Sequence, residues 1–295
     1  MTTPLISASD VQERLNKLDY IIDDGLAMAI YLSLRLEMPL LLEGEPGVGK
    51  TTAAKVLAHV LDAPLLRLQC YEGLTAGEAL YEWNYQRQLL AIRLAESQQR
   101  ELSDADLFTA EFLQERPLLQ CIKHEGPTSP VLLIDEIDRA DDEFEALLLE
   151  FLGESSVTIP ELGTIVAQQP PIVVLTSNRS RELHDALRRR CLYHWIDFPT
   201  PERMVTILRR TVPAADHALI SSAAEFTGWV RDLDLDKPPG MAEAIDWVKA
   251  LTALGASDLA SDTVAATLGT LAKTPDDRDL VMDMVKYDAG ETEGG

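Results

Sequence analysis

Short apolar runs that end in polar residues recur along the first part of the chain. Residues 39–42, 130–134 and 172–175 contain only Pro, Leu, Ile and Val. An unbroken apolar run of this length, without alternation, is typical of a parallel strand that is buried on both faces. Residues 192–198 form the last predicted strand. Buried strands that alternate with helical segments predict an α/β fold, with a parallel sheet between layers of helices.

Apolar residues at helical spacing predict helices between and after these strands. Residues 11–22 and a second segment from Asp24 onward have this periodicity and are expected to cover the sheet. Residues 200–202 open an all-helical region with a cap residue, a first-turn proline and an acid. A further helix over residues 51–61 has an apolar stripe formed by Ala53, Ala54, Val56, Leu57, Val60 and Leu61.

These patterns divide the chain into two domains and a tail. We predict an α/β domain over residues 1–198, a smaller helical lid over residues 199–287, and a mobile tail over residues 288–295, which are polar and rich in glycine. Residues 71–125 are rich in Glu, Gln and Leu and are too many for a single crossover, so they predict a helix with an insertion. The side chains that either contact a substrate protein or pack inside this insertion are Tyr71, Leu74, Tyr81 and Trp83.

Composition is that of an ordinary soluble protein, with 46% apolar and 25% charged residues in a chain of 295. No apolar stretch is long enough to cross a bilayer, and residues 1–10 lack the basic and apolar regions of a secretion signal. Cys70, Cys121 and Cys191 have no metal-ligand spacing and are interpreted as reduced core thiols. Together these features predict a cytoplasmic protein.

The chain is strongly acidic, with a net charge of −23 from 49 acidic and 26 basic residues. Such a charge repels the phosphate backbone of nucleic acids and anionic membrane surfaces. We therefore expect no nucleic-acid partner, and a protein partner is the simpler expectation.

Residues 44–51 match the phosphate-binding pattern G-x-x-x-x-G-K-[ST], between a predicted strand and a predicted helix. The glycines allow a tight turn whose N–H groups converge on phosphate oxygens at the positive end of the helix. Lys50 brings a charge to the outer phosphates, and the Thr51 hydroxyl is a ligand for Mg²⁺. A glycine-rich turn that merely precedes a lysine would not need the flanking strand and helix. The predicted nucleotide-binding residues are Gly44, Glu45, Pro46, Gly47, Val48, Gly49, Lys50, Thr51 and Thr52.

Polar side chains also end the second and third apolar runs. Ligands collect at the carboxyl ends of parallel strands, so Asp135 is expected to hold Mg²⁺ together with Thr51. Glu136 is expected to polarise the attacking water as a general base. A solvated Asp-Glu turn is the alternative, and the phosphate loop argues against it. Asn178 is expected to orient the same water, although an Asn that ends a strand is often only a turn residue.

Residues 188–190 form a triple arginine at the predicted end of a helix. Cations are favourable at a helix C-terminus, which is one explanation for them. The other explanation is an arginine finger, which neutralises transition-state charge in the active site of a neighbouring subunit.

In this order, the phosphate loop, the Asp-Glu strand, the Asn-ending strand and the arginine-bearing helix end resemble an AAA+ ATPase. Residues 132–140, 146–152 and 156–160 are similar to the signature of MoxR-type members, and residues 67–74 resemble their loop after the second strand. The resemblance implies a P-loop NTPase sheet, a hairpin at about residues 156–171 before the Asn-ending strand, and hydrolysis of ATP with Mg²⁺.

Residues 81–84, 190–195 and 238–247 resemble more narrowly the CoxD branch, the ATPases that accompany carbon-monoxide dehydrogenase and related molybdenum hydroxylases. This resemblance implies an ATP-dependent protein-remodelling chaperone that assists maturation of the metal centre of such an enzyme. It also implies a hexameric ring, an apo-metalloenzyme client and a partner with a von Willebrand A domain. The Leu-x-x-Arg-Cys form at the helix end makes Arg190 the first candidate for the finger and Arg189 the second.

Two positions depart from the MoxR-type pattern. Asp138 stands where these chains usually carry Asn, so a hydrogen-bond donor becomes an acceptor. The lid arginine that senses the γ-phosphate is expected near residues 239–240, and no arginine is there. Either Lys237 substitutes for it or the lid couples to nucleotide differently.

Three other functions fit the same core. A nucleic-acid-associated motor is disfavoured by the net charge of −23. A GTP-dependent enzyme is disfavoured by the lack of an Asn-Lys-x-Asp base-reading motif in the sequence. A nucleotide-gated scaffold with little turnover stays an alternative because the lid arginine is missing.

Overall fold

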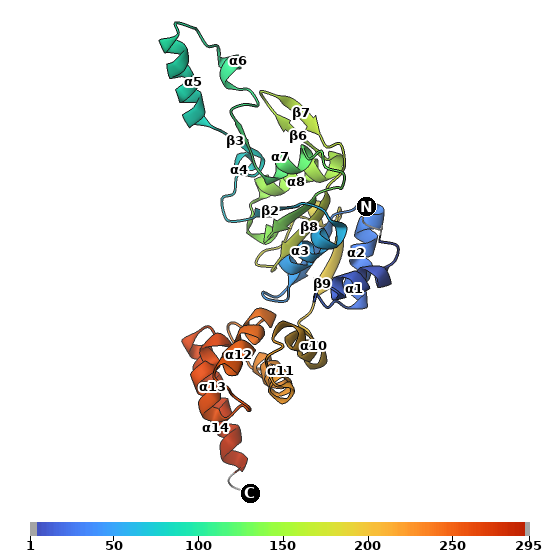
Figure 1. The fold of residues 1–295 in the computed structure, drawn as a ribbon, viewed down its shortest axis with the longest axis vertical. Coiled ribbons are helices and arrows are strands. Elements are labelled where there is room, and N and C mark those ends of the chain that lie inside the picture. Colours follow the sequence, from blue (N-terminus) through green and yellow to red (C-terminus); the bar gives the residue numbers. More distant parts are fainter. Residues whose placement is uncertain (1–4, 293–295) are drawn as a thin grey trace. The chain divides into compact units, whose positions relative to one another are not determined.

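A five-stranded sheet organises the larger unit of the computed structural model, which describes residues 5–292 (Figure 1). Its strand order is β2-β5-β8-β1-β9, and β2, β5, β8 and β1 pair in parallel. Parallel strands end at the same edge, so the residues that follow β5 and β8 are brought together there. The strands are β1 (Leu40–Gly44), β2 (Leu65–Gln69), β5 (Val131–Asp135), β8 (Ile172–Ser177) and β9 (Leu192–Ile196).

Helices flank this sheet, as Figure 1 shows, and the predicted α/β fold with a parallel sheet between helices is confirmed. The helix predicted over residues 11–22 ends earlier than its apolar pattern, at Asn16, and Asp19 beyond it has a left-handed backbone with φ of 60°. The flanking helices are α1 (Ala8–Asn16), α2 (Asp24–Leu36), α3 (Lys50–Leu61), α7 (Pro117–Ile122), α8 (Asp142–Glu154) and α9 (Asp185–Arg188).

The core of this unit explains the apolar strands. Residues 131–134 of β5 are fully buried, and Phe144 and Phe151 of α8 pack into the same cluster. A strand with helices on both faces has no solvent side, so its sequence has no polar alternation.

The region predicted as an insertion contains a small two-stranded sheet with helices. It comprises α4 (Ala76–Leu80), β3 (Tyr81–Trp83), α5 (Tyr85–Ser97), α6 (Asp104–Leu107) and β4 (Leu113–Glu115), with β3 and β4 antiparallel. Trp83 packs edge-on against Phe108, with ring centroids 5.1 Å apart, and Leu74 is buried. Packing therefore accounts for these two side chains, whereas Tyr71 is exposed.

An antiparallel hairpin formed by β6 (Ser156–Ile159) and β7 (Gly163–Val166) precedes β8. Gly163 has a φ of 83° at the turn, a left-handed conformation that favours glycine. After β5, a short 3₁₀ turn over Ile137–Arg139 leads into α8.

The second compact unit consists of residues 15–22, 44–50 and 196–295. This grouping differs from the predicted boundary at residue 198, because the phosphate loop contacts Tyr20 and the start of α12. The helices that follow β9 are α10 (Pro201–Thr211), α11 (His217–Arg231), α12 (Met241–Ala253), α13 (Ser261–Thr267) and α14 (Pro275–Thr292). They enclose a core of their own around Trp247, whose indole Nε1–H donates to Thr267 Oγ1 at 2.8 Å.

The tail predicted from residue 288 is partly wrong, because α14 continues through Thr292. Residues 293–295 lie outside the described part of the chain. Within residues 5–292, no helix combines the length and the apolar character that a membrane span requires.

All three cysteines are buried, as predicted, and burial raises the pKa of each thiol to about 12. At Cys70 the charges of Asp135 and Asp138 contribute to this higher pKa, after burial. A thiol with this pKa stays neutral near pH 7 and is a poor nucleophile.

Iodoacetamide at about pH 8 should therefore leave Cys70, Cys121 and Cys191 unmodified in the folded chain and modify all of them in urea. The folded pKa values lie above the ordinary thiol value of 9.0. The contribution of the neutral thiols to the stability of the fold is therefore complete below pH 9.0. This contribution is lost as the pH rises from 9.0 toward 12, because only the unfolded thiols then ionise. Mass spectrometry of the labelled peptides checks the prediction, and labelling of any of the three before unfolding would contradict it.

Candidate nucleotide-binding site

The phosphate loop joins β1 to α3, and its glycines have the backbone that the pattern predicts. Gly47 and Gly49 have φ values of 80° and 99°, where a side chain would be strained. Lys50 is buried, and its Nζ donates to the carbonyl oxygens of Gly44 at 2.7 Å and Glu45 at 2.8 Å. The loop is therefore curled around the lysine ammonium.

The start of α12 lies directly against this loop within the second unit. Met241 N–H donates to Gly47 O at 3.1 Å. A Cβ built on Gly47 would lie 2.9 Å from Gly240 Cα, and one built on Gly240 would lie 2.8 Å from Gly47 Cα. Only a pair of glycines allows the two backbones to approach so closely.

In the first unit, Asp135 is the centre of a hydrogen-bond cluster at the carboxyl end of β5. Its Oδ1 accepts from Thr51 Oγ1 at 2.9 Å and from Thr176 Oγ1 at 2.6 Å. Its Oδ2 accepts from Arg67 Nη2 at 2.6 Å and Nε at 3.1 Å. The structure thus brings together Thr51 and Asp135, as the sequence predicts. Arg67 and Thr176 were missed.

Glu136 follows with a left-handed backbone, φ 57° and ψ 51°. A residue other than glycine in this region stores about 1–3 kcal/mol and persists only where its surroundings fix it. Here the N–H of Glu136 donates to Thr176 Oγ1 at 2.9 Å, so one hydroxyl links both acids. The Glu136 carboxylate is about one-third exposed and accepts from Arg139 Nη1 at 3.2 Å. It is therefore accessible to water, as a general base must be.

Asp138 accounts for the first departure from the MoxR-type pattern. Its Oδ1 accepts from Asn178 N–H at 3.2 Å, and its Oδ2 accepts from the N–H and the hydroxyl of Ser180 at 2.8 and 2.7 Å. All these partners are donors, so a carboxylate satisfies them better than an amide would. Asp138 thereby fixes the backbone of Asn178 beside β5.

A second buried acid fixes the rest of the loop after β8. Glu145 of α8 accepts from Arg181 Nη2 and from His184 N–H, the latter at 2.9 Å. Arg181 also donates through Nε to Ala140 O at 2.9 Å. The segment between Asn178 and the arginine run is therefore held on α8.

The three arginines after this segment differ in their contacts. Arg188 Nη2 lies 3.7 Å from Glu43 Oε2. Arg189 has a side chain that is 83% exposed and lies 3.9 Å from Asp185. Arg190 Nη1 donates to Leu149 O of α8. Arg188 therefore contacts an acid at the edge of the sheet, whereas the two finger candidates, Arg189 and Arg190, have other partners.

Glu43 is a buried acid that the sequence patterns do not single out. It is 2% exposed near the end of β1, and its Oε2 has no hydrogen-bond partner among the described residues. Arg179 Nε lies 3.7 Å away. The pKa of Tyr193 is raised mainly by burial, and to a smaller extent by the hydrogen bond to Glu43. An acid that interrupts an apolar strand just before the phosphate loop is the signal that could have found it.

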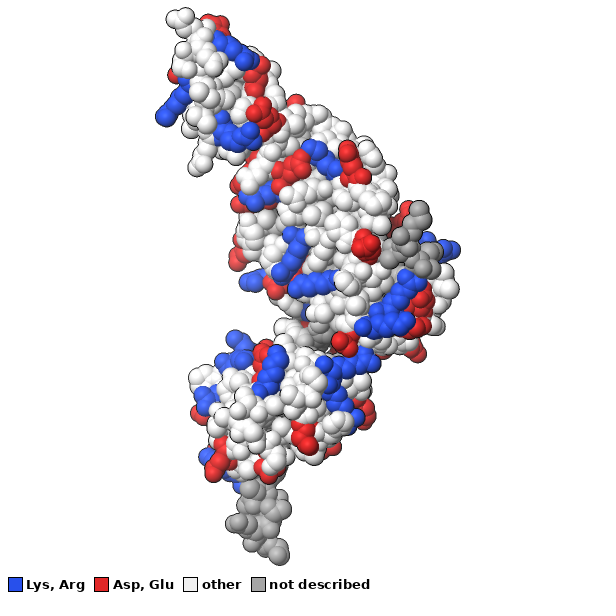
Figure 2. All heavy atoms as spheres, viewed as in Figure 1, with Lys and Arg blue, Asp and Glu red and all other residues white. Residues whose placement is uncertain are grey.

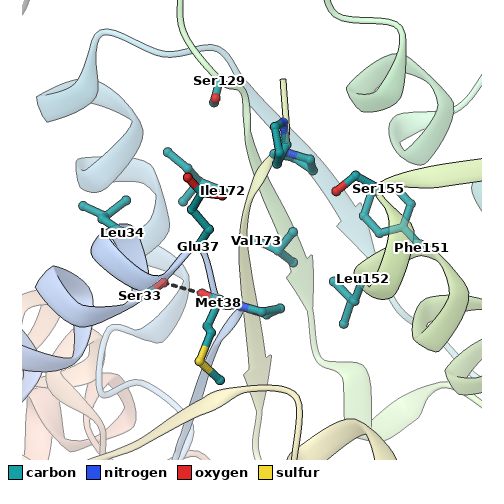
Figure 3. Close-up of a pocket in the computed structure, with 13 residues that line it drawn as sticks. Ser33, Leu34, Glu37, Met38, Ser129, Phe151, Leu152, Ser155, Ile172 and Val173 are labelled. Atoms are coloured by element: carbon teal, nitrogen blue, oxygen red, sulfur yellow. Dashed lines mark hydrogen bonds between the residues drawn. The ribbon is translucent and has the colours of Figure 1, made fainter. Parts of the chain in front are cut away.

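A cavity of about 210 Å³ lies elsewhere in the first unit, where β1 and β8 begin (Figure 3). Ser33 Oγ donates to Met38 O at 2.7 Å on its wall, and Phe151 and Val173 supply apolar surface. None of the predicted site residues lines it. It is therefore not the predicted site.

The residues predicted to hold Mg²⁺ fit that ion. Among the described residues, no group of three or more His, Cys, Asp or Glu side chains is arranged to hold a metal. Mg²⁺ does not need such a group, because it keeps several waters and takes one or two protein ligands besides phosphate oxygens. The Thr51 hydroxyl and the Asp135 carboxylate, 2.9 Å apart, suit that coordination.

Comparison with known families agrees with this geometry. The AAA domain of the dynein-related subfamily matches residues 39–191, which is more than half of the chain and includes the phosphate loop, both acids and Asn178. The chain belongs to this family. Its fold is therefore that of an AAA+ P-loop NTPase.

Individual relatives are distant. An uncharacterized protein of Staphylococcus epidermidis is 25% identical over 77% of this chain and 80% of its own length. Chaperone MoxR1 of Mycobacterium tuberculosis is 28% identical over 66% of this chain, which spans 47% of MoxR1. A point mutant of RuvB from Thermotoga maritima has a TM-score of 0.51, with 21% identity over 89% of this chain and 70% of that one. That likeness concerns the fold alone.

Replacing Asp138 by Asn should destabilise this AAA+ chain. An amide would turn an N–H group toward the donors of Asn178 or Ser180, and a buried unpaired donor costs about 1–3 kcal/mol. Urea unfolding of Asp138→Asn measures the loss.

Asp141→Asn is the matched control. Asp141 is the exposed N-cap of α8 and accepts from Phe144 N–H at 2.9 Å. Asn caps a helix as well as Asp, so its free energy of unfolding should change by less than about 0.5 kcal/mol. Equal stability of both variants would contradict the role assigned to Asp138.

Proposed function

We propose that this protein hydrolyses ATP with Mg²⁺ and uses the energy to remodel a protein client. The 2.9 Å hydrogen bond between Thr51 and Asp135 is the observation that carries the proposal. It pairs the hydroxyl that ends the phosphate loop with the acid of β5, and AAA+ P-loop enzymes need both beside one metal ion.

Each predicted residue has a task in this proposal. Lys50 binds the outer phosphates, and Thr51 with Asp135 holds the ion. When bound, Mg²⁺ neutralises the charge that develops on the phosphate oxygens. Glu136 takes a proton from the attacking water, and Asn178 orients that water. Thr176 positions both acids through its hydroxyl.

In this proposal a neighbouring subunit supplies one more positive charge to the active site. Arg190 is the first candidate for that arginine finger and Arg189 the second, and an exposed side chain suits either role. Such a finger requires an assembly of subunits, for which we propose a hexameric ring.

Remodelling of a protein is supported by the likeness to chaperone MoxR1. The resemblance of residues 81–84, 190–195 and 238–247 to the CoxD branch supports a narrower client. We infer an apo-metalloenzyme of the molybdenum hydroxylase kind, with a von Willebrand A domain protein as the second partner.

A nucleic-acid substrate is disfavoured by the charge of the chain. The net charge is −23, and Figure 2 shows basic side chains interspersed with acidic ones on the face in view. A protein that binds a phosphate backbone needs a continuous basic surface.

Replacing Glu136 by Gln should preserve ATP binding and lower the hydrolysis rate by about 10²–10⁴-fold, because the general base is lost. Calorimetric titration with ATP and phosphate release measure the two effects. Glu143→Gln, at an exposed position in the first turn of α8, is the control and should leave both unchanged.

The Glu136→Gln variant can also be used to identify the client protein. A Glu136→Gln chain held in ATP should retain an apo-metalloenzyme during purification, while Lys50→Ala, which lacks the phosphate-binding charge, should not. Full hydrolysis by Glu136→Gln would overturn the catalytic assignment, and retention of a client with no metal centre would overturn the narrower one.

Mixing inactive variants tests the finger. Arg190→Ala keeps its own Glu136, and Glu136→Gln keeps its own Arg190, so a mixed ring contains sites that have both. Hydrolysis should be absent for each variant alone and regained on mixing, with Arg189→Ala as the parallel comparison. Activity of Arg190→Ala alone, together with loss in Arg189→Ala, would assign the finger to Arg189.

A further inference from the structure

Arg231, the last residue of α11, contacts the phosphate loop inside the second unit. Its Nη2 donates to Glu45 Oε2 at 2.5 Å, and its Nη1 donates to Pro239 O. Its guanidinium stacks on Phe198, 3.7 Å from the ring centroid. The Arg231 side chain is only 13% exposed. These contacts use both the planar fork and the flat face of the guanidinium, which a lysine cannot reproduce.

The two acceptors of Arg231 lie on the two sides of one junction. Glu45 belongs to the loop, and its carbonyl oxygen also accepts from Lys50 Nζ at 2.8 Å. Pro239 precedes Gly240, which touches Gly47, and Met241, whose N–H donates to Gly47 O. Arg231 thus spans the point at which α12 meets the phosphate loop.

The Glu45 carboxylate is 53% exposed, so the Arg231 pair can open without unpacking a core. Arg231 itself stays fixed by Phe198 and Pro239. A change in the loop backbone at Glu45 would therefore break or strengthen this one contact. When a nucleotide binds, Lys50 must replace its hydrogen bonds to the carbonyl oxygens of Gly44 and Glu45 with bonds to phosphate oxygens. This change occurs at Glu45, the residue that Arg231 contacts.

Lys237, the substitute that the sequence offered, is less suitable. It is exposed and lines a cavity of about 410 Å³ beside Glu45 and Gly47. Arg231, in contrast, binds the loop directly.

We propose that Arg231 is the positioning residue that takes the place of the missing lid arginine, and that it transmits nucleotide binding at the loop to α12 through Glu45. This proposal rests on the proposed binding of ATP. It predicts a lid that responds to nucleotide only while the Arg231–Glu45 pair can form.

Hydrogen exchange of a peptide that covers residues 239–247 tests it, without nucleotide and with a non-hydrolysable ATP analogue plus Mg²⁺. In Arg231→Gln, exchange without nucleotide should be at least about threefold faster than in the wild type, because a charged hydrogen bond at the start of α12 is lost. The change on adding the analogue, present in the wild type, should disappear. Glu45→Gln, which leaves the lid core untouched, should give the same two results.

Arg210→Gln is the matched control. Arg210 lies on α10 in the same unit and donates to Asn16 O at 2.7 Å, away from the loop. Its variant should keep the wild-type response. A full analogue response in both Arg231→Gln and Glu45→Gln would overturn the coupling while leaving ATP binding intact. Failure of the wild type to bind the analogue would overturn the proposed function and the coupling with it.

Discussion

The buried carboxylate of Asp135 is the constraint on which the site depends. It is 3% exposed, and a buried charge is tolerated only when hydrogen bonds replace its lost water. Thr51, Thr176 and Arg67 supply them from α3, β8 and β2. Three elements must therefore meet the end of β5 at once. The parallel register of β2 and β5, with Gln69 opposite Asp135, brings Arg67 there.

The same principle shapes the rest of this sheet edge, where acids hold the loops that follow the strands. Asp138 and Glu145 are 2% and 1% exposed, and both accept from the segment after β8. Glu43, 2% exposed, is flanked by two arginines at the end of β1. Part of the acidic excess of this chain is thus internal. Asp138 and Glu145 act as fixed acceptors that order backbone donors near the predicted site, so they belong to its architecture and not to a solvated surface.

Local patterns were enough to predict the strands and to single out the glycine-rich loop and the acids, because each is set by residues close in sequence. The partners of those acids were not predictable in this way. Arg67 lies 68 residues from Asp135, Thr176 lies 41 from it, and Arg231 lies 186 from Glu45. Helix ends were also missed, because α14 passes a glycine-containing polar stretch that suggested a tail. Sequence periodicity carries no information about such distant or terminal choices.

The two departures from the MoxR-type pattern are each matched by their surroundings, which bears on the scaffold alternative. The carboxylate of Asp138 has only donors as partners, all within 3.2 Å. The guanidinium of Arg231 has a carboxylate and a carbonyl as acceptors at the junction where a lid arginine was expected. Asp138 is buried and paired with donors, and the largely covered guanidinium of Arg231 is paired with two acceptors, so the desolvation cost at both places is offset. These pairings therefore favour a lid that is coupled to nucleotide in a different way over a lid that does not respond to nucleotide.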